Sequence, residues 1–164
     1  TLERLQSFGP IADENSKILI LGSMPGVQSL LEQQYYAHPK NQFWPIIFAL
    51  FEEPIEHEYE KRVRFVLKKG IAIWDVVATC QRKGSLDSNI KNETFNDFKN
   101  FYLAYPNIRF IAFNGVKAFE LYKKGVGWLD AGPKEYRQLP STSPANTIKL
   151  EEKLDKWKIM LNYL

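Results

Sequence analysis

Residues 17–50 read KILILGSMPGVQSLLEQQYYAHPKNQFWPIIFAL, and the rest of the chain can be interpreted around them. The segment opens with the apolar run Ile18–Leu21, whose length and branching predict a buried strand. The glycines and proline of residues 22–26 predict a tight turn, where backbone can approach a ligand closely. Aromatic, histidine and amide side chains follow within residues 35–44. This succession predicts a pocket for a flat heterocycle.

The composition is typical of one soluble domain, which we expect to span residues 1–164. Apolar residues make up 45% of the chain and charged residues 25%, and the net charge of +3 permits a polyanionic partner without requiring one. The single cysteine, Cys80, excludes an internal disulfide and fits a reducing cytosol. The chain begins with Thr1 rather than methionine, so we expect N-terminal processing or truncation.

Several function classes have no support in the sequence. No apolar run approaches the roughly 18 residues of a membrane span, and the N-terminus lacks a secretory signal pattern. The two histidines, His38 and His57, stand far apart, and no zinc-site spacing or GxSxG turn occurs. We therefore expect neither metal nor acyl-transfer chemistry.

Strand and helix patterns alternate along the chain after a polar surface lead-in over residues 1–16. The first predicted elements are a loop with a short helix at 26–40, helices at 41–51 and 56–69, a strand at 71–77 and a polar loop at 81–89. A helix at 92–105, a strand at 108–113, a helix through 124, a strand at 135–139, a loop at 139–146 and a final helix at 150–164 follow. The alternation predicts an α/β fold with a mostly parallel sheet covered on both sides. Ligands bind at the carboxyl ends of such strands, so the loops there should form one site.

The aromatic and polar residues of the 35–44 segment each allow two interpretations. Tyr36 lies in a polar loop and is the better candidate for stacking on a base, whereas helical spacing favours a core position for Phe43 and Trp44. His38 is either a general acid or a loop residue bonded to backbone. Asn41 is either part of a site or only a helix N-cap.

Charged and hydroxyl residues in the strand-end loops are equally open. Arg82 and Lys83 form either an ordinary solvated surface or contacts to phosphates. Asp75 and Asp87 either assist catalysis or cap and orient a loop. The hydroxyl residues 141–143 fit a loop that clamps a DNA backbone, and fit equally well the capping of the last helix.

Four segments resemble those of a known family: GSMPG at 22–26, YYAHPKNQFW at 35–44, FNG at 113–115 and LPSTSPAN at 139–146. Together they are similar to the uracil-DNA glycosylase superfamily, and most similar to its DNA-deoxyinosine (hypoxanthine-DNA) glycosylases, family six. The AHPxNxFW segment also resembles the mismatch-specific uracil/thymine branch. The resemblance implies a three-layer α/β/α sandwich around a four-stranded parallel sheet. It also implies a hydrolase that needs no cofactor and cuts the N-glycosidic bond of a flipped base.

The resemblance assigns roles residue by residue. Met24 stands where uracil-specific relatives keep an Asp or Asn that positions water, and this role passes to Asn41 as the catalytic residue. The implied base-binding residues are Gly22, Ser23, Met24, Tyr36, Phe43 and Asn114. The implied DNA-binding residues are His38, Lys40, Arg82, Lys83, Ser141, Thr142, Ser143, Pro144, Ala145 and Asn146. Lys40 replaces the arginine expected there and keeps its charge.

The sequence therefore predicts a monofunctional DNA glycosylase that excises chiefly hypoxanthine, with uracil as a further substrate. The alternatives are a uracil or mismatch glycosylase, and a catalytically silent nucleic-acid binder. The expected partner is double-stranded DNA with a damaged base, with single-stranded DNA as a second form. We expect a cytoplasmic monomer, associated with the nucleoid in a bacterium or archaeon, without membrane contact.

Overall fold

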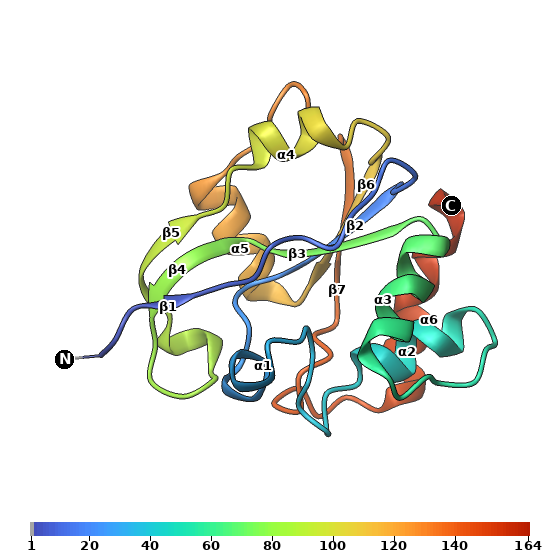
Figure 1. The fold of residues 1–164 in the computed structure, drawn as a ribbon, viewed down its shortest axis with the longest axis horizontal. Coiled ribbons are helices and arrows are strands. Elements are labelled where there is room, and N and C mark those ends of the chain that lie inside the picture. Colours follow the sequence, from blue (N-terminus) through green and yellow to red (C-terminus); the bar gives the residue numbers. More distant parts are fainter. Residues whose placement is uncertain (1) are drawn as a thin grey trace.

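The computed structural model describes residues 2–164 and has a four-stranded parallel sheet at its centre (Figure 1). Its strands are β2 (Ile18–Gly22), β3 (Ile71–Asp75), β6 (Phe110–Asn114) and β7 (Glu135–Leu139), in the spatial order β3-β2-β6-β7. β2 pairs in parallel with both β3 and β6 and is buried along its whole length. The sequence prediction of a buried first strand within a parallel sheet is therefore confirmed.

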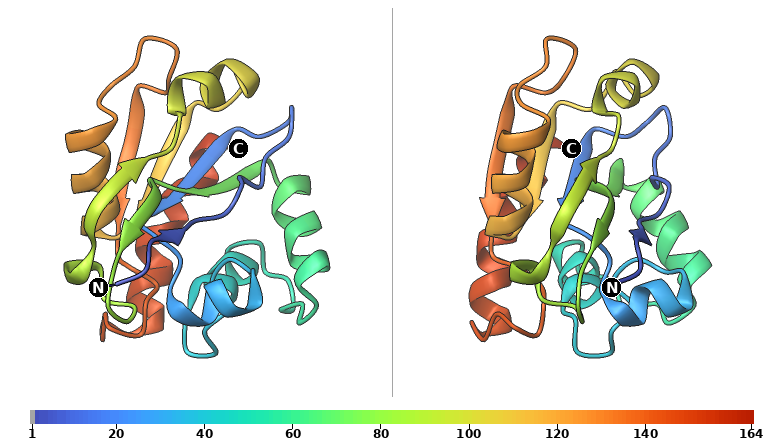
Figure 2. Two further views of the ribbon diagram at one scale, coloured as in Figure 1. Left: turned by 60° about the vertical axis from the view of Figure 1, so that its left-hand side comes forward. Right: turned by 90° about the vertical axis from the view of Figure 1, so that its left-hand side faces the viewer.

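Helices cover both faces of this sheet (Figure 2). They are α2 (Phe43–Leu50), α3 (Tyr59–Lys68) and α6 (Leu150–Trp157) on one face, and α4 (Phe98–Ala104) and α5 (Val116–Gly125) on the other. Successive side chains of a strand point to opposite faces, so Ile18 and Ile20 pack against the first group of helices. Leu19 and Leu21 pack against the second group. The α/β/α layering predicted from the sequence is confirmed.

A second, antiparallel sheet of three strands corrects two sequence predictions. It consists of β1 (Leu5–Gln6), β4 (Val77–Gln81) and β5 (Lys91–Phe95), in the order β1-β4-β5. The strand predicted at 71–77 is thus two strands, because the chain bends at Val76, whose N–H donates to the carbonyl of Gly22 (2.9 Å). The helix predicted at 92–105 begins only at Phe98, after the Asp97 side chain caps it by accepting from the Asn100 N–H (3.1 Å).

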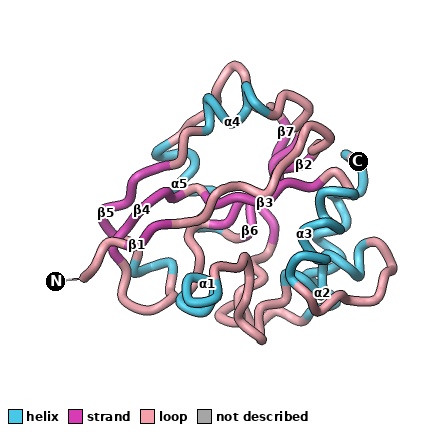
Figure 3. The backbone as a smooth tube through the Cα atoms, viewed as in Figure 1, coloured by secondary structure: helices cyan, strands magenta, loops and turns pink. Residues whose placement is uncertain are grey.

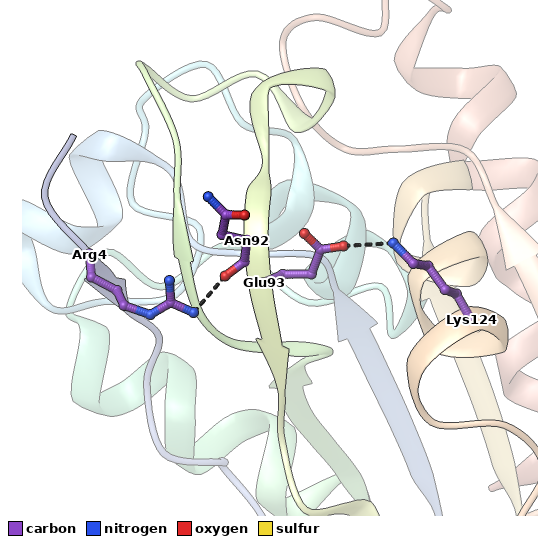
Figure 4. A network of polar contacts seen from close by, with 4 residues as sticks. All are labelled: Arg4, Asn92, Glu93 and Lys124. Carbon is purple, nitrogen blue, oxygen red and sulfur yellow. Dashed lines mark hydrogen bonds and ion pairs between the residues drawn. The ribbon is translucent and has the colours of Figure 1, made fainter. Parts of the chain in front are cut away.

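Polar contacts tie β5 to its neighbours on both sides (Figure 4). The guanidinium of Arg4 donates to the carbonyl of Asn92 (2.5 Å), which links the N-terminal segment to the strand. The carboxylate of Glu93 pairs with the ammonium of Lys124 at the end of α5 (3.1 Å). The part of the lead-in at residues 2–16 therefore contributes β1 to a sheet as well as residues to the surface.

Short elements complete the fold (Figure 3). They are α1 (Val27–Glu32) and the 3-10 turns η1 (Asp87–Asn89) and η2 (Lys158–Tyr163). The short helix expected within residues 26–40 is present, and the final helix predicted at 150–164 is α6 followed by η2. Within residues 2–164, no helix is long and apolar enough to cross a membrane. Cys80 is a buried free thiol.

Candidate active site

A cleft of about 1110 Å³ lies at the carboxyl ends of the parallel strands. Its walls are the loops that follow β2, β3, β6 and β7, together with residues 85–88 and the start of α1. The sequence-predicted site residues that line it are Gly22, Ser23, Met24, Tyr36, His38, Asn41, Asn114 and Ser141 to Asn146. The fold thus brings most of the predicted residues to one place.

The turn after β2 requires a glycine at its first position. A Cβ built on Gly22 would lie 2.5 Å from Oδ1 of Asp75, closer than real Cβ atoms approach, and 3.0 Å from the hydroxyl oxygen of Tyr36, which is a tight contact. The carbonyls of Gly22 and Ser23 accept the N–H groups of Val76 and Val77 (2.9 and 3.1 Å), which holds the turn against the end of β3. The missing side chain therefore lets two polar groups reach the floor of the cleft.

Tyr35 anchors the loop that carries the stacking candidate. Its hydroxyl donates to the carbonyl of Gly9 (2.7 Å), and its backbone N–H donates to the hydroxyl of Tyr59 (3.0 Å). Its carbonyl accepts from the indole N–H of Trp44 (3.0 Å). Trp44 occupies the core position that its helical spacing favoured, and Tyr35 is buried as well.

Tyr36 lines the cleft and rests on a second aromatic ring. Its backbone is left-handed (φ 55°), an uncommon conformation for a bulky residue. Its ring stacks on Phe43, with centroids 3.9 Å apart and an interplanar angle of 18°. Phe43 is fully buried and does not line the cleft, so the expectation that it binds the base is corrected: it supports Tyr36 from behind.

Asn41 and His38 lie on the turn before α2. The Oδ1 atom of Asn41 accepts the N–H of Phe43, the first residue of α2 (2.9 Å), while the side chain also lines the cleft. The Nδ1 atom of His38 accepts the N–H of Lys40 (3.0 Å), which leaves Nε2 directed away from this bond. Lys40 is exposed and lies outside the cleft lining.

Asn114 and Thr142 join the end of β6 to the loop after β7. The amide of Asn114 donates to the hydroxyl of Thr142 and accepts its backbone N–H, both at 3.0 Å. The carbonyl of Thr142 accepts the N–H of Gln42, also at 3.0 Å. Thr142 is only 1% exposed, and its polar groups hold the loop in place at the edge of the cleft.

The rest of the loop at 141–146 is held from below by α6. The indole N–H of Trp157 donates to the carbonyl of Pro140 (3.0 Å). The ammonium of Lys153, which is buried, donates to the carbonyl of Asn146 (2.9 Å). Burial lowers the pKa of Lys153. Pro144 and Ala145 at the tip are exposed, as a segment that contacts a partner must be.

Arg82 is buried, although the sequence predicted an exposed position or a contact to phosphates. Its guanidinium donates to the carbonyls of Gly84 (2.6 Å) and Pro25 (2.7 Å), and the residue is only 4% exposed. The expectation that it contacts phosphates is therefore corrected, because its side chain fixes the 82–89 loop onto the turn after β2. Lys83 is exposed but lies outside the cleft lining.

Two carboxyl groups lie at the cleft. Asp75 is 3% exposed, and burial, together with the charge of Asp87, raises its pKa to about 7, while Arg82 opposes the shift. Asp87 accepts a hydrogen bond from the hydroxyl of Ser23 (2.5 Å), and burial of its carboxyl raises its pKa. Burial thus favours the protonated form of both carboxyl groups, and the pKa of Asp75 reaches about 7.

Three cleft-lining cations were missed by the sequence analysis. Lys117 comes from the start of α5, Arg137 from β7 and Lys156 from α6. No local motif marks them, because only the fold brings these three elements to one edge. The position of Lys117, four residues beyond the end of the strand predicted at 108–113, was the one available signal.

Comparison with known proteins gives the family. Residues 8–164 match the model of the uracil DNA glycosylase superfamily. This chain belongs to that superfamily. The resemblance in the 22–26, 35–44, 113–115 and 139–146 segments led us to expect the three-layer fold described above, and the superfamily assignment confirms that recognition.

Relatives within the superfamily are similar over nearly the whole chain. A protein of Methanosarcina acetivorans named hypoxanthine DNA glycosylase is 36% identical over 161 residues, covering 96% of this chain and 98% of the relative. A protein of Methanosarcina barkeri with the same name is 35% identical over 155 residues, covering 93% and 94%. The solution NMR structure of a Methanosarcina acetivorans protein assigned to the uracil DNA glycosylases superposes with a TM-score of 0.79 at 36% identity, covering 96% of each chain.

Proposed function

We propose that this protein is a monofunctional DNA glycosylase that flips a deaminated base, chiefly hypoxanthine, and hydrolyses its N-glycosidic bond. The observation that carries the proposal is the Tyr36 ring, supported from behind by Phe43, in a cleft that also contains Asn41. The names of the two Methanosarcina relatives support the same substrate.

The stacked ring pair suits a flipped base. Stacking on an aromatic side chain contributes about 1–3 kcal/mol per base, and Tyr36 is already fixed by Phe43, so little side-chain freedom is lost when a base binds. Flipping costs a few kcal/mol and costs least at a mispair. A deoxyinosine pair is therefore selected before chemistry begins.

Hydrolysis needs one oriented water and a stabilised leaving base. The bond breaks through a cation-like sugar, which a weak nucleophile can attack. One lone pair of Asn41 Oδ1 is used by the Phe43 N–H, which leaves the second lone pair and the Nδ2 donors for a water. The backbone N–H groups of Ser23 and Met24 are assigned to the departing base, where fixed donors stabilise developing charge.

The remaining polar surface of the cleft suits the DNA backbone. Lys117, Arg137 and Lys156 neutralise phosphates at the rim. The exposed tip at Pro144 and Ala145 enters the minor groove and fills the space that the flipped base leaves. We assign double-stranded DNA as the substrate and a cytoplasmic monomer as the working form.

The test uses labelled duplexes that carry one deoxyinosine, one deoxyuridine or no lesion, incubated without metal and then treated with alkali. We expect alkali-dependent breakage at inosine, and at uracil to a smaller extent. Asn41→Ala should lose excision and keep duplex binding, while the control Asn162→Ala, at an exposed position of η2, should match wild type.

The other outcomes separate the alternatives. Breakage mainly at uracil would place the protein with the mismatch branch. Duplex binding without breakage at either base would identify a silent binder and would overturn the proposal. Breakage before alkali treatment would contradict the monofunctional mechanism, because a hydrolase leaves the strand intact.

A further inference from the structure

Asp75 carries an unpartnered polar atom on the floor of the cleft. It ends β3, lines the cleft and is 3% exposed, and its Oδ2 atom has no hydrogen-bond partner among residues 2–164. The hydroxyl of Tyr36 is buried and makes no hydrogen bond of ordinary geometry within this part of the chain, although the Asn114 amide lies close enough to lower its pKa. Both groups converge over Gly22, as the 2.5 and 3.0 Å distances to a Cβ there show. Buried polar groups are rarely left unpaired, so this pair indicates a ligand.

The surroundings favour a protonated carboxyl. The guanidinium of the nearby Arg82 donates hydrogen bonds from two of its nitrogens to backbone carbonyls and forms no ion pair with Asp75. Asp87 on η1 raises the pKa of Asp75 through its charge. Asp75 in turn raises the pKa of three tyrosines packed around it, which are Tyr35, Tyr36 and Tyr59. None of these supplies a positive charge. Burial and Asp87 therefore keep a proton on Asp75 up to a pH of about 7.

We propose that Asp75 is a catalytic residue that donates its proton to N7 of the flipped purine while the C1′–N9 bond breaks. The inference rests on the proposed glycosylase function and specifies its chemistry for purines. The electron pair of the C1′–N9 bond goes to the base, and the proton from Asp75 makes the departing hypoxanthine neutral. Water held by Asn41 then adds to C1′, and the proton that it loses returns to the Asp75 carboxylate through solvent. Atoms and charge balance over the cycle.

The proposal explains why a carboxyl is placed here. A purine has an imidazole ring whose N7 accepts a proton, and protonation there withdraws electrons from the bond to the sugar. Uracil has no such ring, and its negative charge can be stabilised by fixed N–H donors instead. Asp75 should therefore matter much more for hypoxanthine than for uracil. Positioned acids of this kind typically contribute about 10²–10⁴-fold in rate.

The test measures single-turnover excision of deoxyinosine by wild type, Asp75→Asn and a control, Asp130→Asn, across pH 5 to 9. Asn keeps the shape and can donate a hydrogen bond, but it cannot transfer a proton. We expect the wild-type rate to fall as pH rises through about 7, the pKa of Asp75. Asp75→Asn should be about 100-fold slower or more, with that pH dependence lost. Asp130 is exposed and outside the cleft, so its variant should follow wild type.

Two results would overturn the proposal. One is an Asp75→Asn variant that excises inosine at the wild-type rate. The other is a wild-type rate that stays constant between pH 6 and 8, a measurement that needs no variant and so remains informative if Asp75→Asn fails to fold. Failure of the proposed function is distinct, because wild type would then excise no inosine at any pH.

Discussion

Replacing Gly22 by alanine should remove most base excision while the fold persists. The new Cβ would lie 2.5 Å from Asp75 Oδ1, whereas ordinary contact begins at 3.4 Å, so the carboxyl must retreat by roughly 1 Å. The Tyr36 hydroxyl, at 3.0 Å, must also give way. A misplacement of about 1 Å at reacting groups costs on the order of 100-fold in rate. Overpacking of this kind costs about 1–3 kcal/mol in the free energy of unfolding.

The assay is single-turnover excision from a deoxyinosine duplex, with urea unfolding measured on the same preparations. The matched control is Gly9→Ala, because a Cβ at Gly9 meets nothing within 4 Å. It should retain the wild-type rate and stability. A folded Gly22→Ala variant that excises inosine as fast as wild type would refute the reasoning, since the crowding of Asp75 and Tyr36 against Gly22 would then have no part in catalysis.

Three further predictions concern the loop, the buried carboxyl and the cationic rim. Thr142→Val removes a buried hydroxyl and leaves the Asn114 amide donor without its partner, so urea unfolding should show a free energy of unfolding that is lower by about 1–3 kcal/mol. The control Thr147→Val, at an exposed position, should leave the free energy of unfolding unchanged. The pKa of Asp75 rises from 3.8 to about 7 on folding, so the native state binds the extra proton between those values. The free energy of unfolding of wild type, measured relative to that of Asp75→Asn, should therefore fall by at most about 4 kcal/mol as the pH increases from 4 to 7. Above pH 7 the difference should stay constant. A rise in this difference between pH 4 and 7 would contradict the argument that burial raises the pKa of Asp75. Replacing Arg137 and Lys156 together by alanine should weaken the binding of duplexes of any sequence. In binding titrations, the slope of log K against the logarithm of the salt concentration should become smaller in magnitude by about 2. An unchanged slope would show that these two side chains do not contact the DNA backbone.

Local patterns in the sequence were sufficient to predict the parallel sheet and the position of the cleft at its edge. The apolar run at Ile18–Leu21, followed by glycine, predicts both a buried strand and the point where it ends, and neither depends on distant residues. Once the strand ends are known, parallel topology places their loops at one edge. That is why the turn at 22–26, Asn114 and the loop at 141–146 were predicted together and are found around one cleft, whereas the role of Asn41 was implied by the family resemblance.

The antiparallel sheet was missed because its local signals favour other structures. Phe95, Phe98 and Phe101 recur at helical spacing, yet only the last two lie on a helix. Phe95 ends β5 and packs against Gly125 of α5, where any Cβ would overlap its ring. A contact across 30 residues of sequence thus overrides the local periodicity, and no single-sequence pattern records it.

Burial of charge was the other feature beyond the sequence. Arg82 lies in a polar loop beside Lys83, a context that is typical of solvent-exposed residues. Its guanidinium is nevertheless buried, because it donates a hydrogen bond to the carbonyl of Pro25, which lies 57 residues away in the sequence. The raised pKa of Asp75 likewise depends on the packing of β2, β3 and the Tyr36 loop around it. The sequence could name Asp75 as a strand-end acid but could not give its protonation state.

The most direct test of base excision is to count the products of one turnover. The protein is mixed in excess with a duplex containing one deoxyinosine, without metal, and released base and strand integrity are measured in the same sample by mass spectrometry and denaturing gel. We predict one free hypoxanthine for each abasic site, an intact strand until alkali is added, and neither product with Asn41→Ala. Absence of free hypoxanthine, or strand breakage without alkali, would contradict hydrolytic base excision by this cleft.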